Sequence, residues 1–217
     1  MRNKFDMQLD RMNAMLIEMG ELCGTAIGNA TKAVEEKDLK LAKIVISEDE
    51  EIDQLEKDIE RLCLKLLLQQ QPVARDLRQI SAALKMITDM ERIGDQASDI
   101  AEILLSGQLK EMKAHSYIVD MASRTSKMVK QSVQAFVEKN LELTRQVILA
   151  DNEVDALFDK IKEELITLLA KEQNKGGEAI DMLMIAKYLE RIGDHATNIA
   201  EWVEFSITGV HRQQEEH

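Results

Sequence analysis

The chain contains few of the residues that interrupt helices or crosslink a fold. Its 217 residues include one proline, two cysteines and only 3% aromatic residues. Apolar residues make up 45% of the sequence, enough for a core, and the many Leu, Met, Ala, Glu and Lys residues favour helix throughout. Cys23 and Cys63 fall inside predicted helices of a protein that we expect in a reducing compartment, so we predict buried thiols rather than a disulfide.

Long apolar runs and an excess of positive charge are also missing. No run approaches the length of a membrane-spanning helix, and residues 1–6 lack the apolar core of a signal peptide, so we expect a cytosolic protein. The formal net charge of −12 disfavours direct binding to nucleic acid or to an anionic membrane, because both need clustered Lys and Arg. The same charge favours multivalent cations and does not bear on protein partners.

The chain instead contains an internal repeat. Residues 91–102, which begin Glu-Arg-Ile-Gly-Asp, return 99 residues later as residues 190–201, nearly letter for letter. Residues 49–53 likewise return at an offset of 102 as residues 151–155. The offset falls by three in the turn before the last helix, where Asn-Lys-Gly-Gly at 174–177 is a strong turn signal. This self-similarity indicates a tandem duplication.

Each copy is predicted to form three long helices with short connections, an up-down-up bundle. In the first copy, one helix is expected over about residues 5–36. A second follows the break at Lys37-Asp38 and stops at Gln71-Pro72, because proline disfavours helix in the residue before it. The third is expected to end near Ser106-Gly107.

Residues 106–115 are predicted to link the two copies. The sequence therefore predicts an all-α protein of two tandem-repeated three-helix bundles, six long helices in total. The predicted domains are residues 1–107 and residues 108–217.

Two acidic residues lie on the core-facing side of the third predicted helix. The apolar residues of this helix recur at steps of three and four, the pattern of one buried stripe: Ile80, Leu84, Ile87, Met90, Ile93, Ala97, Ile100 and Leu104. At about 100° per residue, Glu91 and Asp95 project at roughly 20° and 60° from Ile80, within the arc of this stripe. A buried carboxylate costs several kcal/mol unless it is paired, protonated or bound to a cation. Both acids therefore need a partner.

The second predicted helix carries its own acid pair, Asp49 and Asp53. In an antiparallel hairpin, residues equally far from the turn lie at the same height, and Asp53 with Glu91, like Asp49 with Asp95, is centred on residue 72. The second copy repeats this arrangement about a point within two residues of the predicted turn at residue 174, with Asp155 opposite Glu190 and Asp151 opposite Asp194. The spacing therefore brings four carboxylates level in each bundle.

Chance and ordinary salt bridges are the competing explanation. With 40 acidic residues, roughly seven acid pairs at a spacing of four are expected by accident, and charged runs on helices are usually solvated faces. The levelling about both turns, its presence in both copies and the direction of Glu91 and Asp95 together favour a cation site. Carboxylate oxygens without Cys or His suit iron(III), manganese, magnesium or calcium. No Glu-x-x-His pattern of the di-iron oxidases occurs.

Three further features have two interpretations each. His195 is expected to face solvent or to be satisfied by a neighbour rather than to bind metal, because it lies about 100° around the helix from Asp194. Arg92 and Arg191 are expected to neutralise nearby acids, with anion contact as the alternative. The first helix carries three glycines: Gly20, Gly24 and Gly28. We expect either close helix packing beside them or space for metal, water or an anion.

Three features occur together in this chain: the duplicated Glu-Arg-Ile-Gly-Asp-x-Ala-x-x-Ile-Ala-Glu segments, their Asp-x-x-x-Asp partners and the two three-helix halves. In these features the chain resembles the PhoU family of bacterial phosphate-transport regulators. The resemblance covers essentially the whole chain and implies bound metal ions, a multinuclear iron cluster first, with zinc, manganese or magnesium as alternatives. It implies two ligand sets: Asp49, Asp53, Glu91 and Asp95, and Asp151, Asp155, Glu190 and Asp194. Two residues that extend the motifs by one turn and differ between the copies are further candidate ligands: Asp99 and Asn198.

The resemblance also implies a function. Members of this family negatively regulate phosphate uptake and the phosphate-starvation response through the phosphate ABC transporter, here expected at its ATPase subunit, and a sensor histidine kinase. We expect no catalysis, because the sequence shows no nucleophile and base pair, P-loop or glycine-rich phosphate cradle. We expect a homodimer that binds no nucleic acid and reaches the membrane only through protein partners. The alternative is a metallohydrolase or metal-storage protein whose carboxylates activate water or hold metal.

Overall fold

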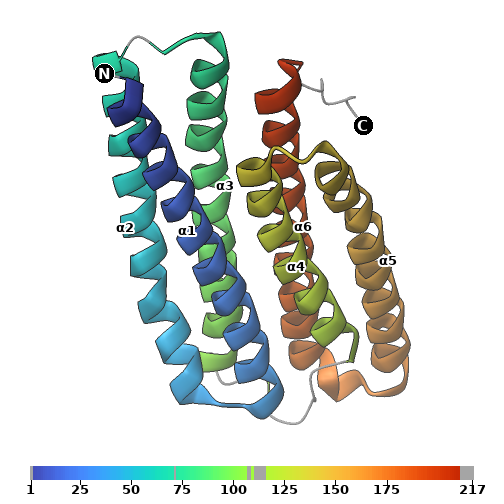
Figure 1. The fold of residues 1–217 in the computed structure, drawn as a ribbon. Coiled ribbons are helices and arrows are strands. Elements are labelled where there is room, and N and C mark those ends of the chain that lie inside the picture. The colour runs from blue at the N-terminus through green and yellow to red at the C-terminus, as the bar shows by residue number, and fades with distance from the viewer. Residues whose placement is uncertain (1, 71, 107–108, 110–115, 211–217) are drawn as a thin grey trace.

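The computed structural model describes residues 2–70, 72–106, 109 and 116–210. These residues form six α-helices and one short 3₁₀ helix, and they contain no strand: α1 (Arg2–Glu36), α2 (Leu39–Gln70), α3 (Ala74–Leu105), α4 (Ser116–Glu138), α5 (Leu141–Lys171), η1 (Gln173–Lys175) and α6 (Gly176–Thr208). The predicted all-α fold of two three-helix bundles is confirmed, and Figure 1 shows the bundles α1–α3 and α4–α6 side by side.

The turns between the first two helices of each bundle use the same local chemistry. Lys37 and Lys139, at the offset of 102, both adopt a left-handed backbone with φ of 56°, which ends the preceding helix. The side chain of the next residue then caps the following helix. Asp38 Oδ1 accepts hydrogen bonds from the Lys40 and Leu41 amides, and Asn140 Oδ1 accepts one from the Leu143 amide. The predicted break at Lys37-Asp38 is therefore confirmed.

The turns between the second and third helices differ from each other. In the first bundle Val73, in extended conformation, precedes α3, where Pro72 predicts a turn. In the second, Gln173–Lys175 forms the 3₁₀ helix η1. Gly176 has helical φ and ψ of −56° and −44° and begins α6, so the two glycines of the predicted turn belong to the helix instead. Most of the predicted linker, residues 107–108 and 110–115, lies outside the described residues.

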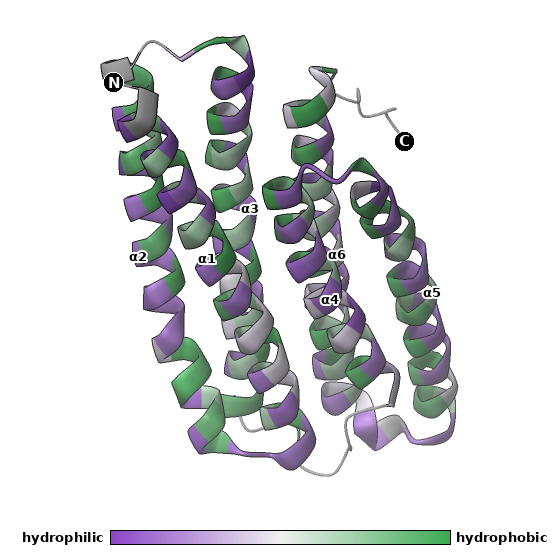
Figure 2. Cartoon of the chain, in the orientation of Figure 1, coloured by the Kyte–Doolittle hydropathy of each residue, from purple (hydrophilic) through white to green (hydrophobic). Residues whose placement is uncertain are grey.

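The core runs through both bundles. Figure 2 shows hydrophobic and hydrophilic residues mixed along every helix, as amphipathic helices require. The predicted stripe of α3 is buried, except that Leu84 is only partly covered. α3 packs against α6 more extensively than any other two helices pack, and α1 also contacts α4. The two bundles therefore share a broad interface.

Two smaller expectations can be compared with the structure. Cys23 and Cys63 are free and buried, as predicted. Burial raises the pKa of both thiols to about 12, so they act as small apolar residues. None of the described helices is both long and apolar enough to cross a membrane.

Candidate metal centres

The hairpin of α2 and α3 brings the first predicted set of acids together. Asp49 Oδ1 lies 2.6 Å from the point where a Cβ would stand on Gly94, the neighbour of Asp95. Asp49 is therefore level with Asp95, as the spacing about Pro72 predicts. We call Asp49, Asp53, Glu91 and Asp95 the first acid patch.

The hairpin of α5 and α6 repeats this geometry. Asp151 Oδ1 lies 2.8 Å from the point where a Cβ would stand on Gly193, which precedes Asp194. We call Asp151, Asp155, Glu190 and Asp194 the second acid patch. In both bundles the aspartate of the middle helix thus rests directly on the backbone of the last helix.

Gly94 and Gly193 are residues of the candidate sites that the sequence analysis missed. A real Cβ almost never approaches another heavy atom within 3.0 Å, so any side chain at Gly94 would displace Asp49 or Ile52. A glycine inside a helix costs about 1 kcal/mol relative to alanine. Its occurrence in the middle of both repeated segments was the available signal, and it marks a close approach between two helices.

Asp49 has the least solvated carboxylate of the first patch. Burial first, and then the charges of Asp95, Asp53, Glu91 and Asp99 in that order, raise its pKa from 3.8 to about 6. Its Oδ1 atom is buried and accepts no hydrogen bond within the part of the chain that the structure describes. Burial and Asp95 also raise the pKa of Glu91. Protons or cations at this patch would therefore be favoured.

The second patch has a stronger effect on its central carboxylate. Burial, then Asp155 and Asp194, raise the pKa of Asp151 to about 7, although the Thr197 hydroxyl beside it lowers the pKa. Desolvation and then Glu190 raise the pKa of both Asp155 and Asp194. The two copies thus share one electrostatic design.

Several acids of the patches also pair with nearby cations. Arg92 lies 3.5 Å from Glu91 and 3.4 Å from Asp95, and Lys57 lies 3.6 Å from Asp53. Lys187 pairs with Glu190. Arg92 pairs with nearby acids, as expected. The charge of Arg191 lowers the pKa of Asp99, which is also an acid. Exposed pairs of this kind contribute little, about 0 to 1 kcal/mol, and none of them involves Asp49 or Asp151.

The oxygen-only donor set of both patches fits a hard cation such as iron(III), manganese or magnesium. The unpartnered, buried Oδ1 atom of Asp49 agrees with that fit. Across residues 2–70, 72–106, 109 and 116–210, no three His, Cys, Asp or Glu side chains are already gathered closely enough to hold a metal ion. The patches are therefore groups of neighbouring acids rather than finished ligand shells.

Asp99 and Asn198 lie apart from the centres of the patches, at the seam between α3 and α6. Asp99 is hydrogen-bonded to Tyr188 of α6, and Asn198 Nδ2 donates to Asp89 Oδ1 of α3 over 3.3 Å. The two bonds are equivalent in the repeat, with donor and acceptor exchanged. Asp99 and Asn198 lie one helical turn after Asp95 and Asp194. A residue one turn further along a helix projects about 40° around the axis, here toward the neighbouring helix. The Asn198 side chain therefore contacts α3 in this structure, and its role as a metal ligand stays a prediction.

His195 is satisfied by a neighbour, as expected. Its Nδ1 atom lies 2.9 Å from Asp89 Oδ1 across the same seam, and both side chains are mostly covered. Asp89 therefore contacts both His195 and Asn198, and sequence reasoning missed it because it lies outside the repeated segment. Its partners come from the other copy of the repeat, which spacing within one bundle cannot show.

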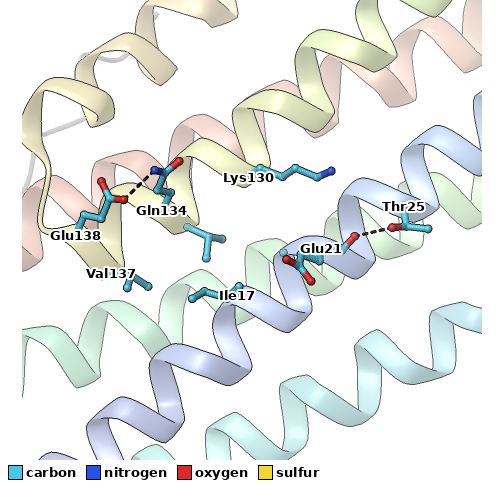
Figure 3. Close-up of a pocket in the computed structure, with 9 residues that line it drawn as sticks. Ile17, Glu21, Thr25, Lys130, Gln134, Val137 and Glu138 are labelled. Carbon is cyan, nitrogen blue, oxygen red and sulfur yellow. Dashed lines mark hydrogen bonds between the residues drawn. The ribbon is translucent and has the colours of Figure 1, made fainter.

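Two of the three glycines of α1, Gly20 and Gly24, belong to helix packing rather than to the acid patches. A Cβ on Gly20 would lie 3.0 Å from Val133, and one on Gly24 would lie 2.5 Å from Lys130, both on α4. Gly28 has nothing within 4 Å. Figure 3 shows the adjoining groove of about 470 Å³, between Ile17, Glu21 and Thr25 of α1 and four labelled residues of α4: Lys130, Gln134, Val137 and Glu138. Close packing is thus the correct interpretation of Gly20 and Gly24.

Comparison with known proteins agrees with this architecture. The family model described as "PhoU domain" matches residues 16–104 and 118–203, one match in each bundle. The PhoU homolog of Clostridium acetobutylicum, named a phosphate-specific transport system accessory protein, is 36% identical over 211 residues, which cover 96% of each chain. The homolog from Aquifex aeolicus is 36% identical over 85% of this chain and 84% of its own.

Two solved structures have the same fold over almost the whole chain. The crystal structure of PhoU from Pseudomonas aeruginosa gives a TM-score of 0.89 at 31% identity, covering 95% of this chain and 100% of that one. The phosphate transport system regulatory protein PhoU from Streptococcus pneumoniae gives 0.89 at 28% identity, covering 96% and 99%. With two matched domains, a full-length relative above 30% identity and a shared fold, the chain belongs to the PhoU family.

Proposed function

We propose that this protein is a metal-binding cytosolic adaptor that negatively regulates phosphate uptake and phosphate-starvation signalling. Its relatives are named accessory or regulatory proteins of phosphate transport, which supports a regulatory role without catalysis. The proposed partners are the ATPase subunit of the phosphate ABC transporter and a sensor histidine kinase. A homodimer that reaches the membrane only through these proteins, and binds no nucleic acid, is part of the proposal.

The observation that carries the metal-dependent part is the duplicated contact of a half-buried aspartate with a helix backbone. Asp49 and Asp151 both rest on glycines, and both have raised pKa values next to further acids. Placing like charges together in poorly solvated positions is unfavourable unless protons or cations compensate. Its presence in both bundles supports selection for cation binding.

The chain's own residues suggest how a bound cation acts. Asp49 and Asp53 on α2, with Glu91 and Asp95 on α3, would hold it in the first bundle, and the corresponding four residues of α5 and α6 would hold it in the second. A bound multivalent cation supplies positive charge that cancels the patch. Without it, the acids repel an acidic partner surface or phosphate groups; with it, the same bundle face can approach them.

A binding measurement with purified partners tests this proposal. Metal-loaded protein should bind the transporter ATPase subunit or the kinase, and Asp49→Asn combined with Asp151→Asn should weaken that binding at least severalfold. Asp10→Asn, the same chemical change at an exposed position on α1, should leave binding unchanged. If metal-free protein or the double variant bound the partner as tightly as metal-loaded wild-type protein does, the metal-dependent mechanism would be contradicted. Strong binding of metal-free protein to pure anionic vesicles would contradict recruitment by proteins alone.

The alternative, a metallohydrolase or metal store, rests on the same carboxylates. A cation held at an open carboxylate site can lower the pKa of bound water and so generate a nucleophile. Steady turnover of phosphoesters by metal-loaded protein, abolished by Asp95→Asn, would favour the enzyme over the adaptor. Binding of many metal ions per chain would favour storage.

A further inference from the structure

A small basic cavity lies at one end of the molecule, where both bundles meet. It has a volume of about 160 Å³ and is formed by the beginning of α3, the end of α4 and the end of α6. Its cationic lining residues are Arg75 and Arg78 from α3 and Lys139, just after α4. None of the residues that line it is acidic, although the whole chain carries a net charge of −12.

The cavity contains a hydrogen-bond donor with no partner. Arg78 Nε is buried and makes no hydrogen bond to any described residue. The neighbouring Gln79 is only 8% exposed and also lines the cavity, while Phe136 and Ile207 give it apolar walls. Ser206 donates its hydroxyl proton to the Val203 carbonyl over 2.8 Å. Its hydroxyl group therefore offers the cavity an acceptor oxygen and no donor. A buried unpaired donor of this kind costs about 1 to 3 kcal/mol, which a bound acceptor would offset.

Helix termini provide the alternative explanation for the three cations. α4 and α6 both end at this cavity, and each helix C-terminus carries roughly half a negative charge, whereas the N-terminus of α3 carries roughly half a positive one. Three full positive charges among the lining residues exceed this difference. Capping of helix carbonyls therefore does not account for all three cations.

The repeat offers an internal comparison. Lys139 corresponds to Lys37 at the offset of 102, and both residues have the same φ of 56°. The shared turn is therefore enough to explain the backbone conformation of Lys139. At the offset of 99, however, Arg75 corresponds to Asn174 and Arg78 to Gly177. The arginines thus have no counterpart at the equivalent position of the second copy. The duplicated framework does not require them.

We propose that this cavity binds a small oxyanion of the phosphate type. Guanidinium groups match the planar, bidentate hydrogen bonding that phosphate oxygens accept, and Lys139 adds a mobile third charge. A volume of about 160 Å³ is below the range of roughly 300 to 1,000 Å³ typical of larger ligands. The occupant is therefore a free small anion rather than a nucleotide. Because the cavity joins α3, α4 and α6, its occupant bridges the two bundles.

Calorimetric titration of inorganic phosphate into full-length protein tests this inference. Chelator removes metal first, so that phosphate cannot bind through metal at the acid patches, and ionic strength is held constant with chloride. We expect saturable binding, competition by sulfate, and affinity reduced roughly tenfold or more by Arg78→Gln. Lys139→Asn should weaken binding severalfold, and Asn tolerates the left-handed backbone. Arg145→Gln, at an exposed position on α5, and Asp49→Asn should leave affinity within about twofold.

The outcomes separate this inference from the proposed function, because the assay uses no metal and no partner protein. Absence of saturable phosphate binding by the wild-type protein would overturn the inference. Phosphate affinity equal to that of the wild-type protein in both Arg78→Gln and Lys139→Asn, with both variants folded by circular dichroism, would overturn it as well. If Arg78→Gln does not fold, the exposed Lys139→Asn decides. Equal competition by chloride and sulfate would show general ionic screening and would also overturn it.

Discussion

Asp49 and Asp151 occupy equivalent positions in the two bundles, yet the pKa of Asp49 is raised to about 6 and that of Asp151 to about 7. Asp95 is the acid with the largest effect on the pKa of Asp49, and Asp155 is the acid with the largest effect on that of Asp151. In both patches burial is the largest cause. The comparison indicates that desolvation affects how strongly each central aspartate holds a proton more than any single neighbouring acid does.

The two patches also differ in the cations around them. Arg92 lies beside two acids of the first patch, whereas Lys187 pairs with one acid of the second. Protons and metal ions compete for the same carboxylate oxygens. We therefore expect the second patch to need a higher pH than the first before metal binds, and the following predictions examine that difference.

Removal of the acids of one patch should have the largest effect. Glu91→Gln with Asp95→Asn should eliminate metal from the first patch and leave the second occupied, and Glu190→Gln with Asp194→Asn should do the reverse. Neither double variant should unfold metal-free protein, because removing like charges relieves repulsion. Elemental analysis gives the metal content per chain. Unchanged content in either variant would refute the ligand assignment for that patch.

Alanine at Gly94 should disturb the first patch without removing any acid. The new methyl group would meet Asp49 Oδ1 at 2.6 Å and Ile52 Cδ1 at 3.0 Å, so Asp49 must move, and we expect metal affinity at that patch to fall about tenfold, or ~1.4 kcal/mol. The matched control is Gly28→Ala, where nothing lies within 4 Å. That variant should be more stable by up to about 1 kcal/mol and keep its affinity. Equal metal affinity in both variants would show that the close contact is irrelevant.

The stability of metal-free protein should depend on pH through both central aspartates. The pKa values of Asp49 and Asp151 are raised from 3.8 to about 6 and about 7, so above pH 3.8 the unfolded chain releases protons that the folded protein retains. The free energy of unfolding should therefore decrease as pH rises through each folded pKa, by about 1 to 2 kcal/mol per site after solvent screening. Urea unfolding should show this decrease ending near pH 6 for Asp49 and near pH 7 for Asp151.

Variants assign the pH effect to each patch. Asp49→Asn should reduce the slope of the profile between pH 3.8 and about 6, and Asp151→Asn should reduce it between pH 3.8 and about 7, because asparagine does not titrate. The prediction is wrong if wild-type stability rises throughout this window relative to the variants.

The seam between the bundles should give the smallest effect. Tyr188→Phe removes the hydroxyl bonded to Asp99 and should cost about 0.5 to 1.5 kcal/mol, with metal binding at the first patch changed little. Asn198→Ala removes the equivalent donor to Asp89 in the second copy, where His195 remains as a partner, so the cost should be smaller. Chemical unfolding of both variants makes the comparison. A larger loss for Asn198→Ala would reverse our interpretation of the seam.

Much of the fold was predictable because helix signals are local. The stripe from Ile80 to Leu104, the break at Lys37-Asp38 and the turn at Pro72 depend on residues near in sequence, and the repeat supplied each signal twice. The levelling of Asp49 with Asp95 was also predictable, since one short turn fixes the register of a hairpin. Gly176 was misassigned because glycine suits both a turn and a helix N-terminus.

The parts that were not predictable depend on contacts between bundles. Asp89 contacts His195 and Asn198 across the α3–α6 seam, and no spacing within one repeat shows how the two copies pack. The same reason explains why Gly20 and Gly24 could not be assigned to the contact with α4. The exact domain boundary and the metal-binding role of the acids remain predictions.

Anomalous diffraction from crystals grown at neutral pH with excess Mn²⁺ tests the central claim most directly. We predict one or more anomalous peaks at each acid patch, with ligands from both helices: Asp49 facing Glu91 and Asp95, and Asp151 facing Glu190 and Asp194. Peaks at neither patch, with Arg92 still paired with Glu91 and Asp95 and Lys187 with Glu190, would show that these acids form ordinary salt bridges and would contradict the account.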